Sequence, residues 1–150
     1  MAYSYTCLLH HLVFSTQDRE SWLQAELRPR LWEYWSAAIR SEGGFCLLAK
    51  GVSDHVHLLA RLRQDKAVSE VLRSTKANSS GWIHDTFSRL WGFHGQDEYG
   101  AFTVSKSQME AVRRYIVGQE AHHRKVMFQE EFLVLLKAHE IEYDEHYLWK

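Results

Sequence analysis

The sequence is poor in the residues that mark several protein classes. It has one proline and two cysteines in 150 residues, and no apolar run approaches the length of a membrane span. Cys7 and Cys46 lie in apolar, strand-like stretches, so we expect buried free thiols in a reducing cytosol rather than a disulfide framework. The first residues lack the basic and apolar segments of a signal peptide, which also predicts a cytoplasmic location. Because no repeat or low-complexity stretch divides the chain, we expect one domain over residues 1–150.

The chain also lacks an excess of positive charge. Eighteen lysines and arginines stand against 19 acidic residues, which gives a net charge of -1 and a pI of about 6.8. This balance argues against a nucleic-acid partner, because phosphate contacts usually leave a basic footprint. Ten histidines weaken that argument, since some can be protonated beside a polyanion.

Four stretches have the composition of β-strands. They are residues 5–14, 45–50, 55–62 and 99–104. In the third stretch the even-numbered positions are apolar and must cover the core. The odd-numbered positions, which include His55, His57 and Arg61, face the other side of the sheet. That side stays open unless a second layer buries it, and the helix that carries Tyr115 could form this layer.

Helical spacing of apolar residues predicts four helices. They cover residues 29–42, 67–87, 107–124 and 128–139. Pro29 fits the first turn of the first helix, and Ser107 with Glu110 forms a capping box at the start of the third. The order strand, helix, strand, strand, helix, strand predicts an α+β fold, a ferredoxin-like sandwich with an antiparallel sheet of about four strands. The two trailing helices would then include the one that carries Tyr115.

His55 and His57 are the strongest chemical signal in the sequence. Positions i and i+2 of a strand share one side of a sheet, so the two imidazoles form a pair of nitrogen ligands for a divalent metal. Tyr115 and Gln119 stand at i and i+4 of a helix and share one of its faces. The amide oxygen would add a ligand, and the phenol would supply a nucleophile whose attack on a phosphodiester leaves a phosphotyrosine ester.

Each of these residues also has a plainer interpretation. A His-x-His pair on a strand is often structural or merely exposed. A tyrosine on an amphipathic helix usually belongs to the core, with its hydroxyl at the rim, and Gln119 would then be a solvated helix residue. The combination of the pair with one helix face favours the metal-dependent interpretation.

Five polar or basic residues are candidates for contacts with nucleic acid. They are His11, Arg61, Lys76, Asn78 and Arg114. For His11, a buried structural role and a role as an outer partner of the metal histidines are equally open. A solvated helix face is the default for Lys76 and Asn78, with phosphate contact as the alternative. Trp82 and Trp91 can stack on bases, although core filling is the commoner use of such residues.

Several motifs, taken in order along nearly the whole chain, resemble the small single-tyrosine transposases of bacterial insertion sequences. These are TnpA-like members of the HUH endonuclease superfamily, which includes the REP-associated tyrosine transposases. The segments that carry the resemblance are HLVF at residues 11–14, GVSDHVHL at 51–58, KANSSGWI at 76–83, YGAFTVS at 99–105, YIVGQEAHHRK at 115–125 and IEYD at 141–144. Family members often have asparagine where this chain has Gly118, and Trp-Gln where it has Gly95-Gln96.

The resemblance implies both a fold and an activity. It implies a ferredoxin-like homodimer that acts on single-stranded DNA with hairpins at the ends of the element. His55 and His57 match the family's metal ligands for Mg²⁺ or Mn²⁺, and Gln119 matches the third ligand. Tyr115 matches the nucleophile that takes the 5′ phosphate and frees a 3′ hydroxyl. In such dimers the tyrosine helix can serve the partner's histidines.

Three functions therefore remain to be separated. The leading hypothesis is a metal-dependent DNA transposase that cleaves and rejoins insertion-sequence ends. The first alternative is a domesticated relative that binds hairpin nucleic acid without cleavage. The second is a metal phosphodiesterase that uses water as nucleophile, with Tyr115 in a structural role.

Overall fold

A four-stranded sheet forms the centre of the protein. The computed structural model describes residues 4–16, 22–87, 99–122 and 127–148, without the side chains of Glu120 and His122. The strands in this part of the chain are β1 (Leu9–Ser15), β2 (Phe45–Gly51), β3 (His55–Arg61) and β4 (Gly100–Val104). They are antiparallel throughout and lie in the order β2-β3-β1-β4.

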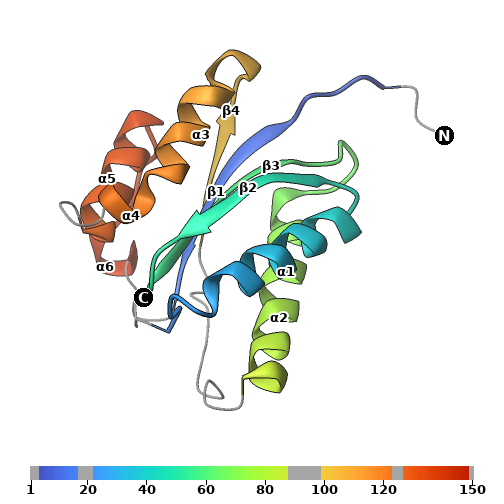
Figure 1. Cartoon of the computed structure of the whole chain (residues 1–150). Coiled ribbons are helices and arrows are strands. Elements are labelled where there is room, and N and C mark those ends of the chain that lie inside the picture. The colour runs from blue at the N-terminus through green and yellow to red at the C-terminus, as the bar shows by residue number, and fades with distance from the viewer. Residues whose placement is uncertain (1–3, 17–21, 88–98, 123–126, 149–150) are drawn as a thin grey trace.

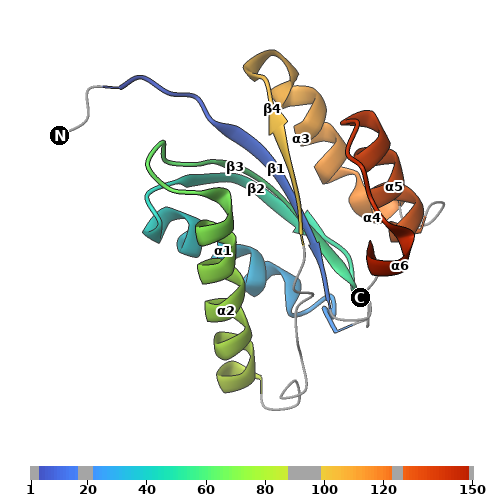
Figure 2. The same ribbon diagram turned by 180° about the vertical axis from the view of Figure 1, so that it is seen from behind.

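Helices cover both faces of this sheet (Figure 1). One face carries α1 (Arg28–Ser41) and α2 (Val68–Thr86). The other carries α3 (Met109–Val117), α4 (Gln119–His122), α5 (Phe128–Ala138) and α6 (Glu145–Leu148), as the reverse view also shows (Figure 2). The predicted ferredoxin-like sandwich is confirmed, with a further helical layer on its second face. Across the described ranges, no helix combines the length and the apolar character that crossing a membrane requires.

The face under α1 and α2 holds the larger apolar core. Leu12 and Leu58 from the central strands are fully buried there, together with Leu72 of α2. Phe14 of β1 packs edge-on against Trp35 of α1, with 5.2 Å between ring centroids. Alternate positions of β1 and β3 build this core, as the period-2 pattern predicts.

The opposite face carries a thinner apolar layer beneath the C-terminal helices. Its buried apolar cluster consists of Val13, Phe102, Phe128 and Leu136. Phe132 and Leu135 of α5 pack against it, which confirms that these residues point inward. His55 and His57 lie on this face and are completely buried. A second layer therefore buries the histidine face.

The first strand begins four residues later than the sequence predicts. Leu9 pairs with Arg61 and Val104, the last residues of β3 and β4, so these strands end where residues 5–8 would need a partner. Cys7 is consequently exposed, and the prediction that its thiol is buried is wrong. Cys46 is half-buried and packs against the larger core.

The segment that carries Tyr115 also differs from the prediction. It opens with a 3₁₀ helix over Lys106–Gln108, and no side chain caps either this turn or α3. The predicted capping box is wrong, because the Ser107 hydroxyl shares a 3.1 Å hydrogen bond with the Ser105 hydroxyl instead. The helix also breaks at Gly118, which separates α3 from α4. Glycine is a poor helix former, so this position is the weakest point of the segment.

Candidate metal and nucleophile site

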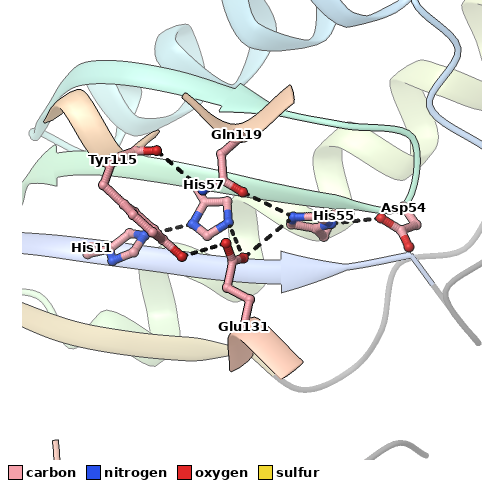
Figure 3. Close-up of polar contacts among 7 residues, drawn as sticks. All are labelled: His11, Asp54, His55, His57, Tyr115, Gln119 and Glu131. Carbon is pink, nitrogen blue, oxygen red and sulfur yellow. Dashed lines mark hydrogen bonds and ion pairs between the residues drawn. The ribbon is translucent and has the colours of Figure 1, made fainter. Parts of the chain in front are cut away.

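The two histidines of β3 direct their Nε2 atoms toward one point (Figure 3). His57 Nε2 lies 2.9 Å from Oε1 of Glu131, and His55 Nε2 lies 3.7 Å from the same oxygen. The alternation of β3 accounts for this arrangement, because Val56 between them points into the opposite core. The pair predicted from the sequence is thus brought together in a buried position.

The other ring nitrogen of each histidine also has a partner. His55 Nδ1 lies 2.7 Å from Oδ1 of Asp54, and His57 Nδ1 lies 2.7 Å from Nε2 of His11 (Figure 3). Such outer contacts fix the orientation of each ring, so that Nε2 is the nitrogen that faces Glu131 and can act as a ligand. His11 therefore lies where an outer partner of the pair is expected, and it is itself buried.

Burial keeps His11 neutral. Desolvation, with a smaller contribution from the neighbouring His57, lowers the pKa of His11 from 6.5 to about 3. A neutral imidazole has one N–H and one lone pair, so it can either donate to His57 Nδ1 or accept from it. The second role is the one that a metal-bound His57 requires, because its Nε2 must then be unprotonated.

Tyr115 and Gln119 reach the histidines from α3 and α4. Gln119 Oε1 lies 3.4 Å from His55 Nε2, and its amide nitrogen donates to the main-chain oxygen of Tyr115 at 3.4 Å. The Tyr115 hydroxyl donates a 2.5 Å hydrogen bond to Oε2 of Glu131. Burial and this carboxylate together raise the pKa of Tyr115 above its ordinary value, so the phenol is neutral at rest. Tyr115 lies beside the histidines of its own chain.

Glu131 of α5 is the residue that the sequence analysis missed. Its carboxylate is buried and stands between the histidines and Tyr115, whereas its neighbour Glu130 is exposed. A signal for it exists in the sequence. Glu131 lies three residues after Phe128 and four before Leu135, so it occupies the apolar stripe of an amphipathic helix. A carboxylate in such a stripe needs a buried partner.

The assembled groups can hold a metal ion. The ligand atoms of His55, His57 and Glu131 all lie within 4.8 Å of one another. Two imidazole nitrogens, a carboxylate and the Gln119 amide oxygen make a mixed N/O set that suits divalent ions such as Mn²⁺. Gln119 and Glu131 are buried like the histidines, whereas Tyr115 is only half-buried.

Of the remaining candidates for nucleic-acid contact, Arg114 alone adjoins a residue of the site. Arg61 is exposed at the far end of β3, four residues and about 13 Å of strand beyond His57. Arg114 is exposed on α3 next to Tyr115. Lys76 and Asn78 belong to α2 and lie across the sheet from the histidines. The Lys76 ammonium lies 5.7 Å from the Phe14 ring centroid, and the Asn78 main-chain oxygen accepts a 3.0 Å hydrogen bond from Tyr34.

Of the two tryptophans considered for base stacking, the structure describes only Trp82. Trp82 of α2 is half-buried and stacks on Tyr34 with 4.7 Å between ring centroids, on the side of the sheet away from the histidines. Trp91 lies outside the described residues, as do Arg124 and Lys125. Base stacking by these tryptophans stays a prediction.

Solved structures with a similar fold support the architecture. A candidate transposase from Deinococcus radiodurans R1 matches with a TM-score of 0.66 and 21% identity, over 79% of this chain and 95% of that one. A REP-associated tyrosine transposase bound to a REP hairpin matches with a TM-score of 0.62 and 16% identity, over 84% of this chain and 74% of the other.

Sequence comparison adds the family. No curated protein matches the chain. The family described as "Transposase IS200 like" matches residues 4–119, a segment that begins before β1 and ends at Gln119. The matched segment contains both histidines of β3 and Tyr115, and it covers well over half of the chain. The protein therefore belongs to the IS200-like transposase family.

Proposed function

We propose that this protein is a metal-dependent transposase that cleaves and rejoins single-stranded DNA through Tyr115. One observation carries the proposal: three functional groups surround a single small oxyanion, the carboxylate of Glu131. The Tyr115 hydroxyl contacts one of its oxygens, and the two Nε2 atoms of the histidine pair approach the other. A scissile phosphate is also a small oxyanion, so one that binds beside the Glu131 carboxylate would meet the same groups.

The chain provides a site that fits a divalent ion. His55 and His57 would hold it through Nε2, with Gln119 as a further ligand, and Asp54 and His11 would keep the rings in place. Mn²⁺ suits this set, and Mg²⁺ is acceptable where a phosphate supplies the remaining oxygens. When bound, such an ion would polarise the phosphate and offset the negative charge that develops during the reaction.

Tyr115 would be the nucleophile in this reaction. Its oxygen forms a bond to phosphorus while the bond between phosphorus and the 3′ oxygen breaks. The phenol proton passes to Glu131, which already accepts its hydrogen bond, and the departing 3′ oxygen takes up a proton to become a hydroxyl. The products are a 5′-phosphotyrosine ester and a free 3′ hydroxyl. Attack of a 3′ hydroxyl on the ester rejoins DNA and releases Tyr115.

The proposed substrate is single-stranded DNA with hairpins at the ends of an insertion sequence. Membership of the family supports a transposase, and one structural neighbour is described as bound to a REP hairpin. Arg113 and Arg114 directly precede Tyr115 on α3 and are exposed, so they would attract a phosphate backbone. Tyr115 lies beside the histidines of its own chain, so this arrangement does not call for a helix from a second copy. The homodimer that the resemblance implies stays a prediction.

A covalent-adduct assay tests this proposal. Labelled single-stranded DNA that carries the element's own ends is incubated with the protein and Mn²⁺ or Mg²⁺, then denatured and separated on a gel. We expect a slowly migrating protein–DNA adduct that disappears in Tyr115→Phe and His57→Ala. Tyr147→Phe is the matched control, because Tyr147 is exposed on α6.

Two outcomes would contradict the proposal. Binding of verified ends without adduct in either metal would favour the hairpin-binding alternative. A cleaved product with no protein-linked DNA would favour a phosphodiesterase that uses water. In both cases Tyr115→Phe would behave like the wild type.

A further inference from the structure

We propose that Glu131 is an anionic ligand of the divalent ion, which lets the protein hold this ion before DNA binds and fastens α5 to the sheet. The inference rests on the proposed function, because it concerns the same histidine site. It goes further by assigning a ligand outside the segment that matches the family, which ends at Gln119.

The geometry around Glu131 is that of a ligand set. Metal–ligand bonds of about 2.1 Å at roughly right angles place neighbouring ligand atoms about 3 Å apart. Glu131 Oε1 lies 2.9 Å from His57 Nε2 and 3.7 Å from His55 Nε2. Small shifts of the carboxylate would therefore admit an ion between these three atoms. Oε2 would keep its hydrogen bond to Tyr115.

A ligand set that includes Glu131 differs in charge from the set predicted by the sequence, in which Gln119 is the third ligand. Two neutral imidazoles and an amide carry no charge, so they would depend on a DNA phosphate to balance a divalent cation. Glu131 adds one negative charge to the protein side. A buried carboxylate is costly unless it is paired, and a divalent cation is the strongest local charge that a site of this kind can acquire. The ion can thus be bound without DNA.

The position of Glu131 links the ion to the C-terminal helix. The apolar residues of α5 that reach the sheet side are Phe128 and Leu136 of the smaller cluster, with Phe132 and Leu135 packed against it. A metal bond from Glu131 to the histidines of β3 would add a strong attachment in the middle of this contact. Binding of the ion therefore stabilises the docked state of α5, as any ligand stabilises the state that it binds.

Manganese binding without DNA tests the inference. Free Mn²⁺ is followed by electron paramagnetic resonance while it is titrated with wild type, Glu131→Gln and Glu130→Gln, each checked for folding by circular dichroism. We expect wild type and Glu130→Gln to bind one Mn²⁺ alike, and Glu131→Gln to bind at least about 100-fold more weakly, because losing even an outer partner of a ligand costs up to that factor. Glu131→Asp should recover part of the affinity.

Hydrogen exchange supplies a second readout that is independent of activity. We expect Mn²⁺ to slow amide exchange across residues 128–138 in wild type and in Glu130→Gln, and to leave exchange in Glu131→Gln unchanged. A ligand role predicts this difference, whereas a carboxylate that only positions Tyr115 does not.

Equal Mn²⁺ affinity in wild type and Glu131→Gln would overturn the inference, and so would a wild type that binds Mn²⁺ only when DNA is present. His57→Ala separates these failures from failure of the proposed function. If His57→Ala loses Mn²⁺ binding while Glu131→Gln retains it, the histidine site stands and Glu131 is not a ligand. If neither substitution matters, the metal-dependent function fails as well.

Discussion

The two faces of the sheet differ in the kinds of side chain that they bury. Under α1 and α2, fifteen buried apolar residues form one continuous cluster among the described residues. Under α3 to α6, the buried apolar cluster has four members, and the space between them holds histidines, a glutamine and a carboxylate. Apolar burial stabilises a fold without direction, whereas polar groups need specific partners. The first face is therefore suited to stabilising the fold, and the second holds the candidate site.

The two faces meet within a single strand. His57 and Leu58 are neighbours on β3, yet one belongs to the polar site and the other to the larger core. Substitution at these adjacent positions should therefore separate function from stability.

Loss of His57 should have the largest effect, and it should fall on activity. We expect His57→Ala to slow adduct formation by at least about 1000-fold, because metal stabilisation of the reacting phosphate is worth several kcal/mol. His146→Ala is the matched control, since His146 is a histidine exposed on α6. Single-turnover kinetics on hairpin ends measure the difference. Equal rates in His57→Ala and the control would break the comparison.

Loss of Leu58 should instead reduce stability. Leu58→Ala removes a fully buried side chain from the larger core, and we expect a loss of about 3 kcal/mol in the free energy of unfolding. Urea denaturation of the metal-free protein measures it. The Mn²⁺ affinity of the molecules that remain folded should change little. A large loss of Mn²⁺ binding in folded Leu58→Ala would show that the two faces are not independent.

Loss of Phe128 should have a smaller and more local effect. Phe128 is the first residue of α5, is buried, and stacks on His55 with 4.4 Å between ring centroids. A phenylalanine in a core usually contributes more than 3 kcal/mol, but α5 packs through the smaller cluster, so we expect it to detach locally while the sheet stays folded. We therefore expect Phe128→Ala to lower the global free energy of unfolding by less than about 2 kcal/mol. Hydrogen exchange should accelerate mainly in α5, and a loss as large as that of Leu58→Ala would contradict this.

The polar face should also make stability depend on pH. Burial lowers the pKa of His11 to about 3 in the folded protein, whereas the unfolded chain has the ordinary value of 6.5. The unfolded state therefore binds a proton first as the pH falls, and folding stability decreases between pH 6.5 and 3. From pH 7 to 5.5 the decrease from this residue is about 1 kcal/mol.

Denaturation in a chelator at several pH values measures this contribution. The neutral variant His11→Asn should lose that part of the slope, while substitutions in the larger core should leave the slope unchanged. An identical pH dependence in wild type and His11→Asn would show that His11 does not titrate as described.

Local patterns predicted most of the fold. Period-2 alternation placed Val56 and Leu58 in one core and the histidines on the opposite face, and the element order gave the sheet topology. The predictions from sequence were wrong where tertiary contacts determine the bounds and caps of an element. The start of β1 depends on where β3 and β4 end, and the cap of the Tyr115 helix depends on side-chain geometry that spacing alone does not fix.

The candidate site was only partly accessible from the sequence. The i, i+2 spacing on a strand correctly predicted that His55 and His57 lie together. The i, i+4 spacing on a helix predicted that Tyr115 and Gln119 share one face. Glu131 was missed because its role depends on how α5 docks, although a carboxylate in an apolar stripe marked the position. Lys76 lies across the sheet from the site because both crossover helices cover one face.

Peptide mapping can identify the residue that becomes covalently linked to DNA. After reaction with hairpin-ended single-stranded DNA and Mn²⁺, the protein is digested with nuclease and trypsin and analysed by mass spectrometry. Trypsin cuts after Arg114 and Arg124, so Tyr115 lies on the peptide of residues 115–124. We predict a nucleotide joined through its 5′ phosphate to Tyr115 on this peptide. A nucleotide on another peptide, or cleaved DNA with every peptide unmodified, would contradict the account.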